Sequence, residues 1–318
     1  MIGDPCGVGP EVCVKALASR ELIEICHPVL IGDVEVVRRA ASLCKVSLPV
    51  VRLSTPAQAK LRSGIIPVLD PGGFDITALR HGEACAASGE AVLAGTALGH
   101  RLARSHEIQG LVLGPVNADS IKATGKIADI DEMQPPGTFM LRLAGALRVV
   151  PLSEHLPLRQ AIEAISPEAI LALVRLLDAT LKGWGFARRR IAVAGINPHA
   201  MFEDDRARVA PAVLLAQREG ISASGPIAPD SVFRMALEDK YEAIVTMFHD
   251  QGQIAVKTVG FAGACTVYIG LPYVLLNVPH GTAFDIAGRG VAQHLSMLAA
   301  LRTAADLAAG RGPAATRH

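Results

Sequence analysis

The stretch Tyr241-Glu-Ala-Ile-Val-Thr-Met-Phe-His-Asp-Gln-Gly-Gln-Ile-Ala-Val-Lys257 combines a strand pattern with a run of polar groups. Residues Ala243 to Met247 form a short apolar segment rich in β-branched side chains, which is typical of a buried parallel strand. The polar run from Phe248 to Gly252 follows at once. Because open α/β sheets bind their ligands at the carboxyl ends of strands, this exit is a candidate site. The alternative is a loop in which His249 and Asp250 only satisfy backbone groups.

Strand and helix patterns alternate along the rest of the chain. Alternation of this kind predicts a largely parallel sheet that is covered by helices on both faces. Residues 121–136 are polar and are predicted to form a loop. The further strands are predicted at residues 28–31, 48–53, 65–69, 111–113, 147–152, 191–194, 266–269 and 274–277. The helices are predicted at residues 11–19, 34–43, 84–105, 167–182, 211–219, 230–237 and 291–309.

Length and composition describe a large aliphatic chain. At 318 residues it can bury a sizeable core, and we expect it to form two lobes. Half of the residues are hydrophobic but only 4% are aromatic, which suits an α/β enzyme packed with aliphatic side chains. No repeat or linker separates the lobes, so we predict that they are interwoven. Residues 1–120 and 258–318 are assigned to the first lobe, and residues 121–257 to the second.

Charge and cysteine content exclude several classes of partner. The formal net charge is +1 and no basic block occurs, so neither nucleic acid nor an anionic membrane has electrostatic support as a partner. No apolar run reaches about 18 residues and no signal-peptide pattern opens the chain, so we expect no membrane segment. Six cysteines without a C-x-x-C pair indicate reduced, mostly buried thiols. We therefore predict a cytoplasmic protein.

Three histidines lie close to the ends of predicted strands. These are His155, His199 and His249. Three neutral imidazoles that meet at one sheet edge make a transition-metal site with an open position for a substrate. Asp230 and Asp250 are candidates as carboxylate ligands or as groups that orient the imidazoles. The alternative is that some of the ten histidines lie near strand ends by chance.

Two segments are rich in glycine. The first, Gly3-Asp-Pro-Cys-Gly-Val-Gly-Pro-Glu11, does not match G-x-G-x-x-G, so it gives a Rossmann site little support. A strand is expected before such a loop, yet only two residues precede it. The second, His280-Gly-Thr-Ala-Phe-Asp-Ile-Ala-Gly-Arg-Gly-Val-Ala292, leads from a strand into the last helix. Its small residues, with His280 and Asp285, can wrap an adenosine and bind its ribose; the alternative is a structural β–α turn.

Several motifs along the chain match one known family when they are taken together: Gly3-Asp-Pro-x-Gly-x-Gly-Pro-Glu, His155-Leu-Pro-Leu, Asn197-Pro-His199-Ala, Gly225-Pro-x-x-x-Asp230, His249-Asp-Gln-Gly, Lys257, Gly270-Leu-Pro and His280-Gly-Thr-Ala-x-Asp-Ile-Ala-Gly. They resemble the 4-hydroxythreonine-4-phosphate dehydrogenase family of pyridoxal phosphate biosynthesis and related pathways. The resemblance extends nearly from end to end. The first and last motifs also resemble the isocitrate and isopropylmalate dehydrogenase fold, which uses a non-Rossmann cofactor site.

The resemblance implies an α/β fold of two α/β/α lobes with a central cleft, and an obligate homodimer with shared active sites. It implies that His155, His199 and His249 bind a divalent metal and are divided between the two subunits. Zinc is the expected metal, with Mg, Mn and Co as alternatives. Lys257 matches a substrate-binding lysine, and residues 280–289 match the adenosine loop. The implied cofactor-binding residues are His280, Gly281, Thr282, Ala283, Asp285 and Gly288.

The chain departs from the family where the family binds its substrate. The Gly-His-Thr-Glu motif is expected between strands 111–113 and 147–152, but Lys126–Gln134 contains no histidine. The family's substrate-binding asparagine and arginine fall at Thr266 and Leu275. An arginine fork is the usual device for binding a dianionic phosphate, so we predict an altered or absent phosphate site.

The predicted activity is that of a metal- and NAD-dependent dehydrogenase that oxidises a secondary alcohol of a hydroxy-acid, with decarboxylation. NAD and NADP both fit the pattern. An unphosphorylated substrate, such as an aromatic cis-dihydrodiol carboxylate, is the first alternative. A phosphate acyltransferase-like protein or a non-catalytic anion binder is the second. The candidate catalytic residues are Lys257, Asp250 and Asp230, and the candidate substrate contacts are Lys257, Thr266 and Asn117.

Overall fold

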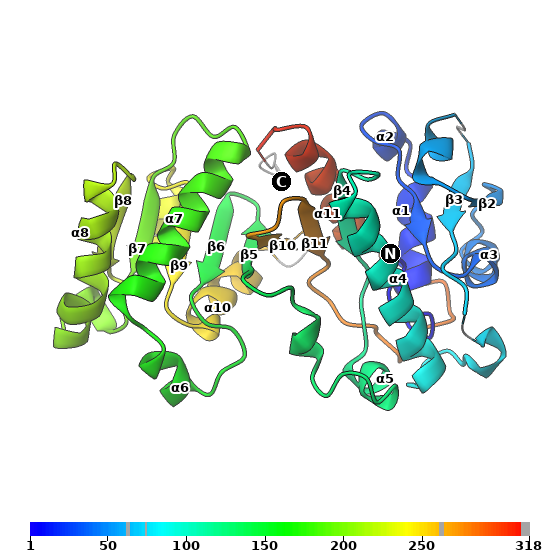
Figure 1. Ribbon diagram of the computed structural model, residues 1–318, viewed down its shortest axis with the longest axis horizontal. Helices are drawn as coiled ribbons and strands as arrows, with labels where there is room; N and C mark the ends of the chain where they lie inside the picture. Colours follow the sequence, from blue (N-terminus) through cyan, green and yellow to red (C-terminus); the bar gives the residue numbers. More distant parts are fainter. Residues whose placement is uncertain (62–63, 74, 261–263, 313–318) are drawn as a thin grey trace. The chain divides into compact units, whose positions relative to one another are not determined.

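The computed structural model describes residues 1–61, 64–73, 75–260 and 264–312 of the chain (Figure 1). It divides into two compact units. Unit 1 comprises Met1–Pro136 and Pro272–Ala308, and unit 2 comprises Gly137–Leu271 and Ala309–His318. Both units are of mixed α/β structure.

Unit 1 contains parallel strands, as the alternation of strand and helix patterns predicts. β1 (Leu30–Ile31), β3 (Ile66–Leu69) and β2 (Val50–Leu53) pair in the order β1-β3-β2. β4 (Gly110–Leu113) pairs in parallel with β11 (Val274–Asn277).

The first two residues of the chain take the place of the strand that is expected before the first glycine-rich loop. The backbone N–H of Ile2 donates to Ile31 O (3.0 Å), on the β1 side. On the β4 side, the amine of Met1 donates to Val112 O (2.9 Å), and the N–H of Gly114 donates to Met1 O (2.9 Å). Main-chain hydrogen bonds thus extend continuously from β1 to β4.

Helices cover the strands of unit 1. α4 contacts β1 and β4, α11 contacts β4 and β11, and α1 packs against α3 and α11. The side chain of Asp33 caps α3 by accepting the N–H groups of Glu35 and Val36, which explains why this helix begins where the sequence predicts. The helical elements are α1 (Gly9–Leu17), α2 (Arg20–Ile23), η1 (Pro56–Leu61), α3 (Val34–Leu43), η2 (Ile76–Ala78), α4 (Ala86–Arg104), α5 (Ala118–Ala123), η3 (Ile130–Met133) and α11 (Leu295–Ala308).

Unit 2 contains a mixed sheet. Four neighbouring strands, β6, β9, β7 and β8, are parallel, whereas β5 is antiparallel to both β10 and β6. Only Gly145 and Ala146 connect β5 to β6, and so short a connection can join only antiparallel strands. The order is β10 (Cys265–Ile269), β5 (Phe139–Ala144), β6 (Leu147–Pro151), β9 (Ala243–Thr246), β7 (Ile191–Ala194) and β8 (Ala223–Ile227).

One apolar core cluster of unit 2 lies where α9 (Val232–Leu237) and α10 (His249–Val259) cover one face of this sheet. Val232 and Val256 from these helices pack with Val149 and Ile244 from β6 and β9. α7 and α8 lie on the nearer face in Figure 1. The remaining helical elements are α6 (Leu158–Glu163), α7 (Pro167–Gly183), η4 (Pro198–Ala200), η5 (Asp205–Val209) and α8 (Ala210–Arg218).

Some elements differ from the sequence-based expectation. Residues 121–136 are not entirely a loop, because they include the end of α5 and the single turn η3. Strands β5 and β8 and the helix that begins at His249 were not predicted. Among the described residues, none of the helices combines the length and the apolar character that a membrane crossing requires.

All six cysteines are free thiols. Cys6, Cys13 and Cys265 are buried, and the other three are partly exposed. Burial raises the pKa of Cys6 and that of Cys13 to about 11. These two thiols are therefore protonated at neutral pH, which fits packing roles and not nucleophilic ones.

Candidate active site

The exits of β6 and β9 bring two of the predicted histidines together. These strands are parallel neighbours, so their carboxyl ends lie at the same edge of the sheet. The pairing continues past β6, because the N–H of Leu152 donates to Thr246 O at 2.8 Å. The hydroxyl of Ser153 then donates to the carbonyl of Met247 at 3.4 Å. As a result, the residues that follow Ser153 lie beside those that follow Met247.

Glu154, His155 and His249 form a cluster of possible metal ligands, here called the His-Glu cluster. One ligand atom from each residue lies within 4.8 Å of the others. The imidazole centroids of His155 and His249 are 5.2 Å apart, with the rings tilted by 53°. Two imidazoles and one carboxylate are a donor set of catalytic zinc sites, in which a fourth position stays open for water or substrate. The geometry therefore fits a divalent transition metal.

The neighbour of His249 orients its ring. A carboxylate oxygen of Asp250 accepts a hydrogen bond from Nδ1 of His249 at 2.7 Å. Because a carboxylate is only an acceptor, Nδ1 carries the proton and Nε2 keeps its lone pair for another partner. Asp250 therefore fixes the orientation and the tautomer of this ring, as a carboxylate commonly does for a histidine that binds a metal.

Two further residues fix the start of α10. The side-chain amide of Gln251 accepts from the N–H of Met247 (2.7 Å) and donates to the carbonyl of Gly195 (2.8 Å), so it connects the exits of β9 and β7. At Gly252, a Cβ atom would lie 2.7 Å from Thr246 Oγ1 and 2.9 Å from a methyl group of Val149. Only glycine allows the helix to approach the sheet this closely.

A buried ion pair supports the His-Glu cluster. Arg142, on β5, binds both carboxylate oxygens of Glu154, with Nη1–Oε1 and Nη2–Oε2 distances of 2.7 and 2.6 Å. The two side chains are only 6% and 15% exposed. Nη1 also donates to Met140 O at 2.8 Å. Sequence reasoning missed both residues; the available signals were a carboxylate directly before His155 and an arginine within an apolar run.

The third predicted histidine, His199, follows β7. Its backbone has a positive φ of 58°, which is uncommon for a residue other than glycine and often marks a functional site. Asp205 is buried and holds this loop, because its carboxylate accepts the N–H groups of Ile196 (2.7 Å) and Phe202 (3.1 Å). Within one protomer, and among the described residues, His199 is not part of the His-Glu cluster. Its role as a ligand to a metal in the partner subunit stays a prediction.

Three other candidate residues of unit 2 occupy different environments. Lys257 lies in the last turn of α10 and is exposed. It follows His249 by eight residues, and a helix rises about 1.5 Å per residue, so about 12 Å along the axis separates them. Thr266 is 6% exposed on β10 and is the register partner of Arg142. Asp230 is exposed and accepts a hydrogen bond from the Ser231 hydroxyl at 3.1 Å.

The predicted substrate contact Asn117 and the departure at Leu275 lie in unit 1. The side chain of Asn117 caps α5 by accepting the N–H of Ser120 at 2.9 Å. Leu275 has no exposed surface and packs in β11. A side chain buried in this way cannot replace a phosphate-binding arginine.

The segment that replaces the family's Gly-His-Thr-Glu motif presents carboxylates. Asp129 and Glu132 form a capping box around η3. Asp129, Asp131 and Glu132 are all exposed. This segment therefore presents three acidic side chains at its surface and no histidine.

The predicted adenosine loop, residues 280–289, is held by α1. The N–H of Gly288 donates to a carboxylate oxygen of Glu11 at 2.7 Å, and Glu11 is 1% exposed. The ammonium of Lys15 donates to the carbonyls of Gly290 and Ala292, both at 2.7 Å. Charge-assisted hydrogen bonds of this kind are stronger than neutral ones. The backbone that follows the loop is therefore fixed in place.

The first glycine-rich segment contacts the same loop. The N–H of Val8 donates to Thr282 O at 2.9 Å. A Cβ atom at Gly7 would lie 2.7 Å from the Cβ of Thr282, so only glycine fits there. Thr282 is buried, whereas Gly281 and Asp285 are exposed. The exposed Asp285 carboxylate can accept hydrogen bonds from ribose hydroxyls.

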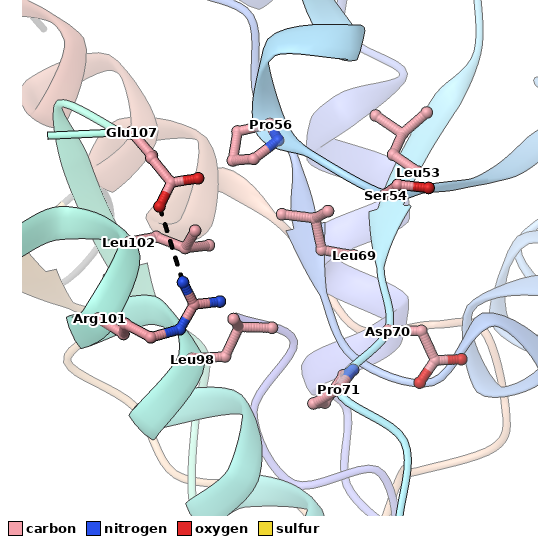
Figure 2. A pocket seen from close by; sticks show the side chains of 10 residues that line it. All are labelled: Leu53, Ser54, Pro56, Leu69, Asp70, Pro71, Leu98, Arg101, Leu102 and Glu107. Carbon is pink, nitrogen blue, oxygen red and sulfur yellow. Dashed lines mark ion pairs between the residues drawn. The ribbon is translucent and has the colours of Figure 1, made fainter. Parts of the chain in front are cut away.

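A separate cavity of about 470 Å³ lies in unit 1, beside the ends of β2 and β3 (Figure 2). Leu98 and Leu102 of α4 face it, together with Leu69. At its margin, Arg101 and Glu107 form an ion pair at 3.6 Å. None of the predicted site residues lines this cavity.

Comparison with known proteins identifies the family. A family model described as "Pyridoxal phosphate biosynthetic protein PdxA" matches residues 24–304. The chain belongs to the PdxA family. A protein of Novosphingobium aromaticivorans, provisionally named as a 4-hydroxythreonine-4-phosphate dehydrogenase, is 42% identical over 315 residues, which cover 98% of this PdxA-family chain and 94% of the relative.

Solved structures agree with this family and its fold. A 4-hydroxythreonine-4-phosphate dehydrogenase from Burkholderia phymatum is 33% identical, with a TM-score of 0.84 and 96% of each chain covered. A terephthalate 1,2-cis-dihydrodiol dehydrogenase from Burkholderia xenovorans is 28% identical over 96% of each chain, with a TM-score of 0.68. An isocitrate dehydrogenase from Methylococcus capsulatus, at 13% identity over 97% of this chain and 86% of its own, has a TM-score of 0.50 and shows a likeness of fold alone.

Proposed function

We propose that this PdxA-family chain is a metal- and NAD(P)-dependent dehydrogenase that oxidises a secondary alcohol of a hydroxy-acid, with loss of CO₂ from the oxidised product. The observation that carries the proposal is the His-Glu cluster, with ligand atoms within 4.8 Å of one another. Relatives named as dehydrogenases support the reaction class.

The metal proposal rests on the chemistry of the donor set. His155 and His249 would hold the ion, with His199 of the partner subunit as a further ligand in a homodimer. A divalent ion bound here, with zinc favoured, would supply Lewis-acid polarisation of a substrate oxygen. The chain's own part is to hold the imidazoles in one tautomer, which Asp250 does for His249 at 2.7 Å.

The remaining residues have proposed roles in binding and proton transfer. Lys257 anchors an anionic group of the substrate, because its ammonium is exposed on the same helix as His249. Thr266 and Asn117 are proposed substrate contacts. Asp250 and Asp230 are the candidates for accepting the proton of the substrate hydroxyl.

The cofactor proposal rests on the 280–289 loop. Exposed Asp285 is suited to the ribose hydroxyls, and exposed Gly281 leaves open space in which a base can lie. His280, Thr282, Ala283 and Gly288 complete the proposed site. A nicotinamide dinucleotide would accept the hydride, and the loop would bind its adenosine half.

A second candidate function is the same dehydrogenase reaction on a substrate of another class. The buried Leu275 and the carboxylates Asp129, Asp131 and Glu132 argue against a phosphorylated substrate. A related structure is named for action on a terephthalate cis-dihydrodiol, which has no phosphate. We therefore include an unphosphorylated cyclic diol carboxylate as the alternative substrate class.

Steady-state assays test both candidates. Reduction of NAD and of NADP is measured with 4-phosphohydroxythreonine and with an aromatic cis-dihydrodiol carboxylate, before and after chelation. We expect activity that chelation removes and that a divalent metal restores. Full activity after chelation would exclude the metal mechanism. Absence of both metal binding and NADH binding would favour a phosphate acyltransferase-like protein or a non-catalytic anion binder.

A further prediction concerns Lys15, which holds the backbone after the adenosine loop. Lys15→Met removes two charge-assisted hydrogen bonds. We therefore expect the dissociation constant for NADH to rise about tenfold, which is a loss of about 1.4 kcal/mol of binding free energy. NADH fluorescence titration without substrate measures this. Lys182→Met, an exposed lysine on α7, is the control and should leave the constant unchanged. If the Lys15→Met variant binds NADH as tightly as wild type does, the hydrogen bonds of Lys15 do not contribute to cofactor binding.

A further inference from the structure

We propose that Glu154 is a third ligand to the metal from the same protomer as His155 and His249, and that Arg142 is the residue that positions its carboxylate. This inference rests on the metal site of the proposed function. It adds a residue that is neither a histidine nor part of the motifs that carry the family resemblance.

The position of Glu154 is the first argument. Its carboxylate is one of the three groups whose ligand atoms lie within 4.8 Å of one another. Glu154 lies in the segment after β6 and is the residue before His155. His249 lies in the segment after β9, at the same edge of the sheet. The same backbone pairing that places His155 therefore places Glu154.

The second argument is the capacity of the carboxylate. An ionised carboxylate offers about four lone-pair positions, and a bidentate arginine uses two of them. Arg142 takes one position on each oxygen, at 2.7 and 2.6 Å. The other positions can accept a metal ion while the ion pair stays intact. Metal-binding carboxylates are commonly held by such a second hydrogen-bonding partner.

The third argument is that Arg142 is held at several points. Its side chain is 6% exposed on β5, which is paired on both sides, and a buried charge requires a partner. Nη1 also bonds Met140 O at 2.8 Å, which fixes the guanidinium to the strand. Glu154 is thereby attached to the sheet and not to a mobile loop, so its carboxylate is held in place before any ion arrives.

Unit 2 offers a matched comparison in Glu242. This carboxylate is 7% exposed and is also held by an arginine: Arg190 donates to it from Nη2 (2.7 Å) and from the backbone N–H (2.7 Å). Glu242 is not part of the His-Glu cluster. Replacing it removes a buried carboxylate from an arginine pair without touching the proposed ligands, although Arg190, at 33% exposed, is less buried than Arg142.

Metal binding by the purified dimer tests the proposal. Wild type, Glu154→Gln, Glu242→Gln and His249→Ala are stripped with a chelator and titrated with Co²⁺ and Zn²⁺ by calorimetry. The visible spectrum of bound Co²⁺ reports its ligands. We expect Glu154→Gln to weaken binding by about 10- to 100-fold and to change the Co²⁺ spectrum. Glu242→Gln should bind as wild type does, and His249→Ala should lose binding.

The outcomes separate this inference from the proposed function. If Glu154→Gln binds Co²⁺ with wild-type affinity and spectrum while His249→Ala does not, Glu154 is only the counterion of Arg142, and the metal mechanism stands. If wild type binds neither ion, both proposals fail. Fluorescence of Trp184, the single tryptophan, verifies that unit 2 is folded. If Glu154→Gln does not fold, the same titration is made with Glu154→Asp. This variant keeps the negative charge, but its side chain is one methylene shorter, so its carboxylate is displaced from the proposed ligand position.

Discussion

His249→Ala is expected to lower kcat/KM for the hydroxy-acid by at least about 1,000-fold, because a bound ion supplies several kcal/mol of transition-state stabilisation and each 1.36 kcal/mol is a factor of ten. His249 lies in the first turn of α10 and its side chain is partly exposed, so the alanine variant removes a proposed ligand with little effect on the core. Metal content, turnover and oligomeric state are measured on the same preparation. We expect the oligomeric state of wild type to be kept while metal and turnover are lost.

The control for this prediction is His27→Ala. His27 is exposed in unit 1, far along the sequence from the His-Glu cluster, and has no proposed role. It should retain wild-type turnover. A His249→Ala protein that lacks metal but keeps kcat/KM within tenfold of wild type would contradict the proposed mechanism.

Arg142→Met is expected to lower the free energy of unfolding of unit 2 by about 3–5 kcal/mol, because it leaves the buried carboxylate of Glu154 without its partner. Urea unfolding in the presence of a chelator, followed by Trp184 fluorescence, measures this change. Trp184 is 9% exposed and ends α7, so it reports on unit 2 itself. The double variant Arg142→Met/Glu154→Leu should recover much of the loss, because it removes both charges together.

An exposed ion pair in the same unit provides the control. Arg175 binds Glu219, but the two side chains are 53% and 38% exposed. Solvent screens such a pair, so Arg175→Met should change stability far less than Arg142→Met does. If the two variants lose similar stability, burial of the Arg142–Glu154 pair does not contribute as proposed.

Local sequence patterns were sufficient to predict many of the strands and helices of the chain. The strands Ile191–Ala194 and Val274–Asn277 and the helix Val34–Leu43 lie within the residues predicted for them. Short runs of β-branched residues, and an aspartate before an amphipathic segment, depend only on neighbours in sequence. For the same reason, His155 and His249 could be recognised as residues that follow strands.

The elements that were not predicted from the sequence depend on contacts between distant parts of the chain. β5 contains Arg142 within an otherwise apolar run, and a charge at such a position argues against a buried strand until its partner is known. That partner, Glu154, is twelve residues away and belongs to a different segment. The helix that begins at His249 was not predicted, because a polar first turn is also typical of a loop.

Residue order alone was enough to recognise the family, the alternation of strands and helices, and the histidines that follow strands. The folded structure was needed to show that β6 and β9 are neighbours, that Glu154 lies in one cluster with His155 and His249, and that a buried arginine holds it. Ligands separated by nearly a hundred residues have no pattern of spacing. Their meeting depends on strand order, which arises when the whole sheet buries its apolar faces.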